Sequence, residues 1–349
     1  MTSPSPSTSP SPSVLVLGAS GRFGQAAVEA FADAGWQVAA QRRPAPTGSP
    51  ALSPRTRWRW VEVDAADTAR LAAEVGHADV VVHAMNPPYT AAAWRAEAPG
   101  LMHAAIHASA ALGALLMFPG NVYNFGARMP QRLREDTPQH PTTAKGAVRA
   151  ALERQLADAW TAQSVSSVVI RAGDFFGKGR GSLFDRVIVK DITRGHLGWP
   201  GAAEVATPWA YLPDLARAFV QVAQRRHALQ GAEVLHFAGQ QLRLQDWIDA
   251  LSPLARRQGW LAAGANLKVR GIPWPVLRLG ALLLPTWASI VEMRYLWQTP
   301  HALDNGRLQA LIGSEPRTPL SLAVTQACND LGLAADRSSP LQPASGVGR

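Results

Sequence analysis

Three glycines at a fixed spacing are the first feature of the chain that could do chemistry. Gly18, Gly21 and Gly24 follow a short apolar run and precede an amphipathic stretch, so we expect them to join a buried strand to a helix. In such a turn the first glycine permits a tight bend, the second lets the backbone approach a pyrophosphate, and the third lets helix and strand pack closely. The pattern predicts a dinucleotide site whose phosphates face the helix N-terminus, against the alternative of a glycine-rich turn without a ligand.

The residues after the second expected strand indicate which dinucleotide is bound. An NAD site has an acidic residue there for the ribose 2′-hydroxyl, whereas this chain has Arg42 and Arg43. Two guanidinium groups attract a 2′-phosphate through charge-assisted hydrogen bonds, so NADP(H) is predicted over NAD(H). The alternative is that Arg42 and Arg43 are solvated loop residues. Asp64 ends the third expected strand, and it either accepts from the adenine amino group or caps the helix that starts near Asp67.

Other contacts to the dinucleotide are expected around the glycine turn and at the ends of later strands. His83 is alternatively a histidine of the core. The predicted cofactor-binding set is Gly18, Ser20, Gly21, Arg22, Phe23, Gly24, Arg42, Arg43, Asp64, His83, Ala84, Met85, Arg149 and Phe175.

A second candidate is a stripe of ionisable residues on a long helix expected at about 142–163. Lys145, Arg149 and Glu153 recur at i, i+4 and i+8, so they share one helix face. A neutral lysine takes up a substrate proton, and its ammonium form stabilises an alkoxide. A free lysine has a pKa of about 10.4, so the base role requires desolvation, and a permanently charged electrophile is an equal alternative. The competing interpretation is a solvated helix face on which Glu153 bridges Arg149.

Two polar residues follow the fifth expected strand. Asn121 and Tyr123 are candidate donors at a reacting oxygen, although Tyr123 alternatively packs against Phe125. His103 and His107 are spaced for one helix face, but no Glu or Cys accompanies them at a metal-like spacing. We therefore predict a helix surface there and no metal site.

The hydrophobic pattern predicts the elements that position these residues. Strands spaced by helical stretches favour an α/β fold, a Rossmann-type doubly wound parallel sheet. Residues 13–175 are expected to form an NAD(P)-binding domain, and 176–335 a smaller, mostly helical substrate lobe in which 233–238 can return to the sheet. Residues 1–12 and 336–349, rich in Ser and Pro, are expected to be disordered. The expected strands are 14–17, 36–41, 58–63, 79–84, 114–118 and 167–171.

Composition limits the partners of this 349-residue chain. Its net charge of +9 comes from scattered residues, so no specific nucleic-acid partner is predicted, and the single Cys328 excludes an internal disulfide framework. The first dozen residues lack the charged and apolar regions of a secretory signal, which favours a cytoplasmic location. The most apolar window, 272–291, is interrupted by prolines and Arg278, so we expect a buried helix pair and no membrane contact.

Aromatic segments in the second half of the chain indicate the kind of substrate. Residues 196–201, 207–211 and 293–297 carry Trp and Tyr side chains that are expected near the reacting end of the site, or alternatively in the core. They predict an apolar or ring-bearing small molecule as the substrate, and a nucleotide sugar is the alternative.

The sequence does not indicate whether the chain forms a homo-oligomer.

Taken together, these motifs resemble the extended short-chain dehydrogenase/reductase superfamily over about residues 14–332, and within it the NAD-dependent epimerase/dehydratase group. The resemblance implies a Rossmann-type domain followed by a smaller C-terminal substrate lobe. The residues that carry it are the glycine pattern, Val63-Asp64, His83-Ala84-Met85, Asn121-Val122-Tyr123, the segment from Arg171 to Gly177, and Pro213-Asp214-Leu215-Ala216.

The catalytic end departs from that group. The resemblance implies a Ser or Thr after the fifth strand and a Tyr-x-x-x-Lys on the next helix. Aligning on Val122-Tyr123 puts Pro119 at the Ser/Thr position, and aligning on Glu153 puts Lys145 at the Tyr position and Arg149 at the Lys position. The stripe also resembles isoflavone-reductase-like enzymes, in which a lysine acts as the acid/base.

The leading prediction is therefore NADPH-dependent reduction or oxidation of a carbonyl or alcohol, with Lys145 in place of the usual Tyr. One alternative is a nucleotide-sugar epimerase or dehydratase with a different proton-transfer residue. The other is a non-catalytic NADP(H)-binding sensor.

Overall fold

The computed structural model describes residues 11–44 and 57–334. The two terminal arms predicted from composition lie outside the described residues, except for Ser11 and Pro12.

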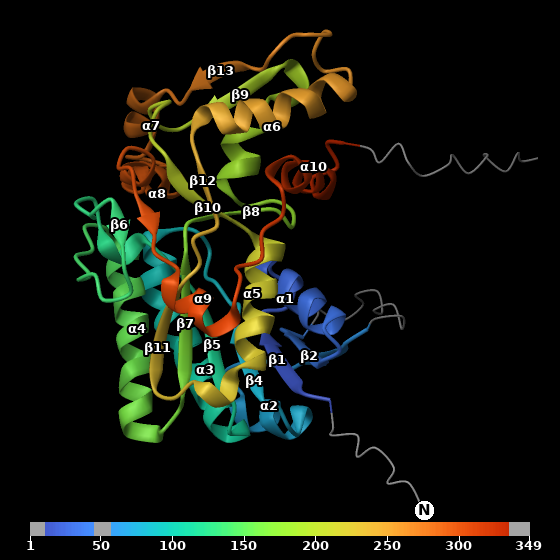
Figure 1. Ribbon diagram of the computed structural model, residues 1–349. Helices are drawn as coiled ribbons and strands as arrows, with labels where there is room; N and C mark the ends of the chain where they lie inside the picture. Colours follow the sequence, from blue (N-terminus) through green and yellow to red (C-terminus); the bar gives the residue numbers. More distant parts are fainter. Residues whose placement is uncertain (1–10, 45–56, 335–349) are drawn as a thin grey trace, which may run out of the picture.

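A seven-stranded parallel sheet forms the centre of the molecule, in the order β11-β7-β5-β4-β1-β2-β3 (Figure 1). The chain order reverses between β1 and β4, so the carboxyl ends of these two strands border a crevice, where α/β sheets bind their ligands. This sheet confirms the predicted fold class. Its strands are β1 (Ser13–Leu17), β2 (Gln37–Arg42), β3 (Arg59–Glu62), β4 (Val80–His83), β5 (Leu115–Asn121), β7 (Ser167–Ala172) and β11 (Ala232–His236).

Helices cover both faces of the sheet, which is why its central strands β1, β4 and β5 are buried along their whole length. Val14 and Val16 of β1 pack in one core with α1 (Arg22–Asp33) and α5 (Leu212–Gln224). Leu15 and Leu17, which point the opposite way, pack in a second core with the helices of the other face. Those helices are α2 (Thr68–Val75), α3 (Ala91–Leu112) and α4 (Ala144–Gln163).

Part of the second half of the chain returns to the sheet. β11 pairs in parallel with β7, as the pattern at 233–238 allowed, and α5 packs against α1 through Phe219 and Phe23, whose rings lie 4.8 Å apart. The expected boundary at residue 175 is thus crossed by elements that complete the first domain.

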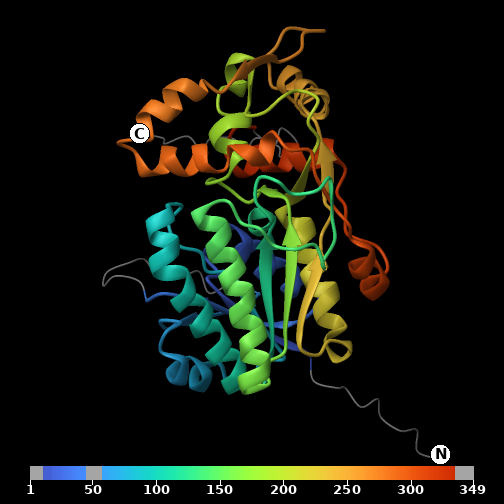
Figure 2. The same cartoon turned by 90° about the vertical axis from the view of Figure 1, so that its left-hand side faces the viewer.

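The C-terminal lobe lies over the carboxyl ends of the strands (Figure 2). Its core contains Phe176, Phe184, Trp209 and Trp247, all buried, so these two tryptophans are core residues. The remaining elements are β6 (Arg132–Leu133), β8 (Asp174–Phe176), β9 (His196–Trp199), β10 (Thr207–Tyr211), β12 (Gln240–Leu242), α6 (Leu244–Arg257), β13 (Lys268–Gly271), α7 (Trp274–Gly280), α8 (Pro285–Glu292), β14 (Ala302–Leu303), α9 (Gly306–Ile312) and α10 (Leu320–Asp330).

The expectation of a buried helix pair at 272–291 is wrong in one respect. The pair exists as α7 and α8, but no residue of α7 is buried, and Leu283 between the helices is 85% exposed. Pro273 and Pro275 lie at the start of α7 and Pro285 at the start of α8, and nothing in the described part of the chain covers this apolar turn.

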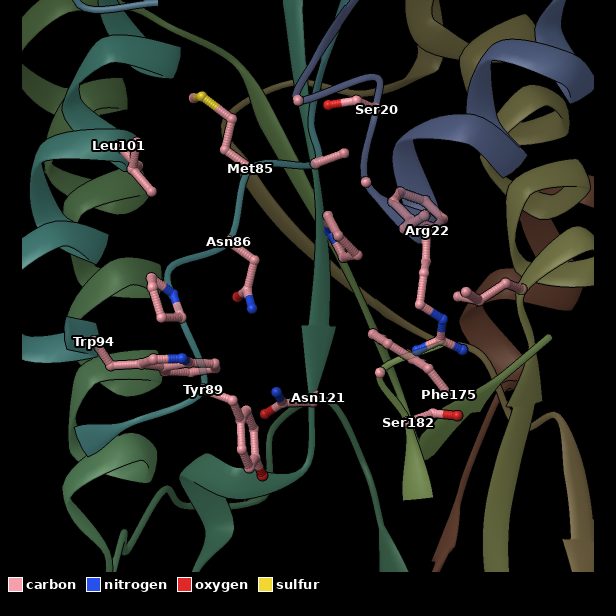
Figure 3. A pocket seen from close by; sticks show the side chains of 18 of the residues that line it. Ser20, Arg22, Met85, Asn86, Tyr89, Trp94, Leu101, Asn121, Phe175 and Ser182 are labelled. Carbon is pink, nitrogen blue, oxygen red and sulfur yellow. The ribbon is translucent and has the colours of Figure 1, made fainter. Parts of the chain in front are cut away.

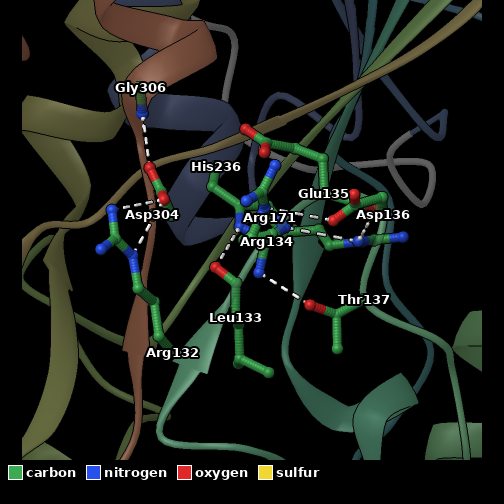
Figure 4. Close-up of polar contacts among 10 residues, drawn as sticks. All are labelled: Arg132, Leu133, Arg134, Glu135, Asp136, Thr137, Arg171, His236, Asp304 and Gly306. Carbon is green, nitrogen blue, oxygen red and sulfur yellow. Dashed lines mark hydrogen bonds and ion pairs between the residues drawn. The ribbon is translucent and has the colours of Figure 1, made fainter.

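Buried Arg171 and His236 of the sheet hold the loop between β5 and α4 through the backbone carbonyls of Glu135 and Leu133 (Figure 4). Arg171 donates to Glu153 through Nε (3.0 Å) and NH2 (2.6 Å), and its NH1 lies 3.3 Å from His236 Nε2. His236 Nδ1 lies 3.2 Å from the Leu133 carbonyl, which makes a neutral imidazole donating through Nδ1 the fitting form. Glu153 therefore pairs with Arg171 and does not bridge Arg149, contrary to the solvated-face interpretation of the stripe.

Candidate functional site

One cavity of about 790 Å³ runs from the glycine turn at the end of β1 to the underside of the C-terminal lobe (Figure 3). Its dinucleotide end is lined by the carboxyl ends of β1 and β2, and its other end by the loop after β4, the end of β5, and residues of the lobe. The cavity thus occupies the crevice that the strand order creates.

The glycine turn has no room for larger residues. Gly18 has φ +73°, and a Cβ on it would lie 2.9 Å from the Met85 backbone. A Cβ on Gly24 would lie 2.2 Å from the Gly18 carbonyl oxygen. Gln41 holds the turn by accepting from Gly18 N (2.9 Å) and donating to the Val63 carbonyl (2.7 Å). The backbone is therefore preset for a group that approaches it closely.

This turn fits the diphosphate of a dinucleotide. α1 begins at Arg22, and its N-cap residue Gly21 offers no side-chain cap, so the first amides of the helix keep unused donors. Such donors, with the helix dipole, stabilise an anion at the position where the cavity meets the turn.

Arg42, Arg43 and Asp64 lie on the wall of the cavity beside this turn. The Arg42 guanidinium lies 5.2 Å from the centre of the Trp60 ring, and its Nε donates to Glu62 at 2.9 Å. Arg43 is exposed at the rim.

Asp64 is not the cap of the next helix. Its Oδ1 accepts from Ala66 N at 2.9 Å, while Asp67 is the N-cap residue of α2 and accepts from Arg70 N. Asp64 consequently remains available on the cavity wall.

The remaining predicted cofactor residues divide into two groups. Ser20, Phe23, Ala84, Met85 and Phe175 line the cavity, as does Arg22, which donates to the Gly177 carbonyl through Nε (3.2 Å) and NH2 (2.7 Å). His83 is not on the wall. It stacks on Phe118 at 5.0 Å, and burial holds its pKa at about 3, so it is a neutral core histidine.

Arg149 is buried and reaches the middle of the cavity. Its guanidinium lies between the rings of Trp94 (4.9 Å) and Phe118 (5.0 Å), and NH1 donates to the Pro119 carbonyl at 3.1 Å. Its Nε has no hydrogen-bond partner, and desolvation lowers its pKa to about 10. This Nε is enclosed by protein atoms, so the part of the guanidinium on the cavity wall, and not Nε, fits a ligand oxygen.

Polar groups converge at the lobe end of the cavity. The hydroxyls of Tyr89 and Tyr123 lie 3.3 Å apart, and Asn121 Oδ1 accepts from Tyr123 N at 3.0 Å, which leaves the Asn121 amide NH₂ group to donate. Desolvation raises the pKa of both tyrosines, so both stay protonated near neutrality. Figure 3 shows Tyr89 and Asn121 pointing into the same space.

Asp174 lies at the same end of the cavity and was missed as a site residue by sequence reasoning. It accepts from Trp297 Nε1 at 2.6 Å, and desolvation raises its pKa to about 6. Asp174 belongs to the motif from Arg171 to Gly177, which contributes to the family resemblance but did not by itself indicate a site residue. Tyr89 and Trp94, also on the wall, carried no local signal.

The structure places Lys145 behind this wall. Its side chain is fully buried, with Nζ 3.2 Å from Glu292 Oε2 and 4.5 Å from the centre of the Tyr89 ring. Burial lowers the pKa of Lys145, and the Glu292 carboxylate opposes that shift. The alternative of a solvated helix face is wrong, because Lys145 and Arg149 are both buried. Direct action of Lys145 on a substrate stays a prediction, and it would require Tyr89 to move.

The paired histidines of α3 lie on a helix surface. His103 and His107 stack on α3 with ring centres 4.0 Å apart, and residues 11–44 and 57–334 contain no group of three His, Cys, Asp or Glu that could hold a metal ion. No helix within these residues is long and apolar enough to cross a membrane.

The model of the NAD dependent epimerase/dehydratase family matches residues 14–236, from β1 through β11. The chain belongs to this family. The match covers the sheet, the glycine turn and most of the cavity wall.

Solved structures of epimerases share the fold. UDP-glucose 4-epimerase from Brucella ovis, solved with NAD, is 17% identical with a TM-score of 0.68, covering 93% of this chain and 99% of its own. UDP-glucuronic acid 4-epimerase from Bacillus cereus, also with NAD, is 16% identical with a TM-score of 0.67, covering 90% and 96%. At these identities the likeness concerns the fold. A search of curated proteins finds no match.

Proposed function

We propose that this family member is an NADP(H)-dependent oxidoreductase that acts on the carbonyl or alcohol of an apolar or ring-bearing small molecule. The observation that carries the proposal is the single cavity, which joins a glycine turn flanked by Arg42 and Arg43 to an aromatic end with convergent polar groups.

The preference for NADP(H) rests on the residue at the carboxyl end of β2. Arg42 is the last residue of β2, and its guanidinium faces the cavity with Arg43 beside it. A 2′-phosphate would draw Arg42 from Glu62 and add a charge-assisted hydrogen bond at low cost, because that ion pair is solvent-exposed.

When bound, the nicotinamide would supply or accept a hydride. Arg149 is suited to hold an oxygen of the cofactor, because its guanidinium group lies on the cavity wall. Asn121 is suited to donate to the substrate carbonyl oxygen, and the hydroxyl pair of Tyr89 and Tyr123 to give that oxygen its proton on reduction. In the oxidative direction the alcohol would give its proton to a phenolate of this pair, so one of the two hydroxyls would first have to release its own proton to solvent.

Lys145 has a positioning role in this proposal. Its ammonium group lies under the Tyr89 ring at 4.5 Å, where the positive charge favours the electron-rich ring face and fixes the ring beside Tyr123. Lys145 thus takes the place of the usual Tyr on the helix, but acts through Tyr89.

The character of the substrate follows from the walls at this end. Trp94, Trp297, Leu183 and Ile290 supply apolar surface, which favours a ring-bearing molecule. The Asp174 carboxylate at the same end repels a second phosphate group and favours a substrate with a hydrogen-bond donor.

The experiment compares NADPH with NADH by quenching of tryptophan fluorescence. We expect tighter binding of NADPH, and a loss of about tenfold or more in NADPH affinity in Arg42→Ala/Arg43→Ala, because charge-assisted bonds are removed. Arg70→Ala is the matched control, since Arg70 is exposed on the neighbouring helix α2 and lies off the cavity wall. Equal or tighter binding of NADH by the wild type would refute the preference.

A nucleotide-sugar epimerase or dehydratase is the second candidate, supported by the fold shared with UDP-sugar epimerases. A screen of ring-bearing ketones and aldehydes for NADPH oxidation, run beside UDP-glucose and UDP-galactose, separates the two. Cofactor binding with turnover of neither class would favour the sensor.

A further inference from the structure

Five of the seven large apolar side chains that the described residues expose belong to α7 and the turn after it. Leu279, Leu282 and Leu283 are 72%, 80% and 85% exposed. Single apolar residues are common on a protein surface, whereas a contiguous exposed group of them is not. Those of the hairpin are Val276, Leu279, Leu282, Leu283 and Leu284, whereas Val269 lies on β13 and Leu322 on α10.

These leucines form the tip of a hairpin made by α7 and α8, seen in orange at one side of the C-terminal lobe in Figure 2. The two helices pack where Gly280 meets Trp287, since a Cβ on Gly280 would lie 2.3 Å from the Trp287 ring. A backbone hydrogen bond from Leu284 N to the Gly280 carbonyl (2.9 Å) closes the turn at the tip.

The base of the hairpin is fixed to the rest of the protein. Trp274 at the start of α7 donates from Nε1 to the Pro200 carbonyl at 3.2 Å and stacks on Trp297. Glu292 at the end of α8 accepts from Ala144 N at 2.6 Å and from Lys145 Nζ. The apolar tip is therefore presented outward by a base that does not depend on the tip for its packing.

The segment of sequence that leads into this hairpin carries charges of one sign up to Glu292, at the end of α8. No acidic residue occurs between Asp249 and Glu292, whereas the same segment contains Arg256, Arg257, Lys268, Arg270 and Arg278. Lys268 and Arg270 lie on β13, directly before α7, and all of β13 is exposed. An apolar tip with tryptophan nearby and a cationic border is the arrangement that peptides use at anionic lipid interfaces.

We propose that the tip of the α7–α8 hairpin docks the protein on the surface of an anionic phospholipid bilayer. The leucines enter the boundary between headgroups and acyl chains, and Lys268, Arg270 and Arg278 contact lipid phosphates. The protein lies on the membrane and does not span it. Because α8 also contributes Ile290 to the cavity wall, this docking places the lobe end of the cavity beside the lipid.

The experiment measures cosedimentation of the full chain with vesicles. We expect binding to vesicles of phosphatidylcholine mixed with phosphatidylglycerol, much weaker binding to phosphatidylcholine alone, and release by added salt. Leu282→Ser/Leu283→Ser is expected to lower the partition coefficient about tenfold or more, because each exposed leucine loses its transfer into lipid. Arg270→Gln/Arg278→Gln is expected to reduce binding and to weaken its dependence on salt.

Leu322→Ser is the matched control, because Leu322 is 58% exposed but lies on α10, away from the hairpin. Equal loss of binding in that variant, or no binding of the wild type to the mixed vesicles, would overturn the proposal. A leucine-dependent dimer without lipid binding, seen by analytical ultracentrifugation, would overturn it in favour of a second copy of the chain. None of these measurements needs a cofactor or turnover, so a negative result leaves the proposed function intact.

Discussion

Glu292 joins the last turn of α8 to the first turn of α4 through two contacts. One carboxylate oxygen accepts from Ala144 N at 2.6 Å, and the other lies 3.2 Å from Lys145 Nζ. The lysine is fully buried and Glu292 is 21% exposed, so the pair is largely removed from water. A single ion pair thus couples the C-terminal lobe to the helix whose side chains approach the reacting end of the cavity.

The first prediction concerns the stability that this pair provides. Glu292→Gln leaves the buried Lys145 ammonium without a counter-ion, and we expect a loss of about 3 kcal/mol in the free energy of unfolding. Lys145→Met should cost less, and the double variant less than the sum of the two, because the buried charge and its partner are removed together. Urea unfolding measures all three, and additive losses would contradict the coupling.

The same lysine variant separates two chemical roles. With Lys145→Met, a positioning role predicts a reduced kcat with an unchanged pH profile, because Tyr89 keeps its hydroxyl but loses the cation under its ring. Direct proton transfer by Lys145 predicts loss of the limb of the pH profile that the lysine controls. Full turnover in this variant would exclude both roles.

A second prediction follows from the raised pKa of Asp174, about 6 in the folded protein against about 3.9 in an unfolded chain. Between about pH 4 and pH 6 the folded state binds a proton that the unfolded state does not, so this group lowers stability as pH rises through the window. Asp174→Asn keeps an acceptor for Trp297 Nε1 and removes the buried charge. We expect it to raise the free energy of unfolding by about 1–3 kcal/mol near pH 7 and to give no gain near pH 4. The same gain at both values would show that the effect is not electrostatic.

The third prediction concerns the glycine turn. Gly24→Ala places a methyl group 2.2 Å from the Gly18 carbonyl oxygen, so α1 must move away from β1. We expect loss of dinucleotide binding together with a destabilisation of about 1–3 kcal/mol. Gly100→Ala is the control, since a Cβ at Gly100 in α3 meets no atom within 4 Å and should be neutral or slightly stabilising. Calorimetric titration and thermal unfolding report the two effects separately, and intact binding in Gly24→Ala would refute the role given to the turn.

The sequence by itself determined the scaffold and the position of the glycine turn. Gly18, Gly21 and Gly24 lie within one strand–turn–helix unit, and Arg42 lies at the end of the next strand, so local spacing was sufficient to place them; their binding of a dinucleotide stays a proposal. The sheet could be predicted for a similar reason, because strands buried on both faces are apolar runs whatever packs against them.

Only the tertiary structure decided what surrounds the stripe and the leucines. Helical spacing puts Lys145 and Arg149 on one face, but it does not say that Tyr89 and Glu292, the latter 147 residues along the chain, enclose the lysine. An apolar window such as 272–291 has the same composition whether it is buried or exposed, and only the packing of α7 against α8 left its leucines uncovered. The first outcome depends on contacts between distant segments, and the second on whether any distant segment covers the turn between α7 and α8; a local pattern encodes neither.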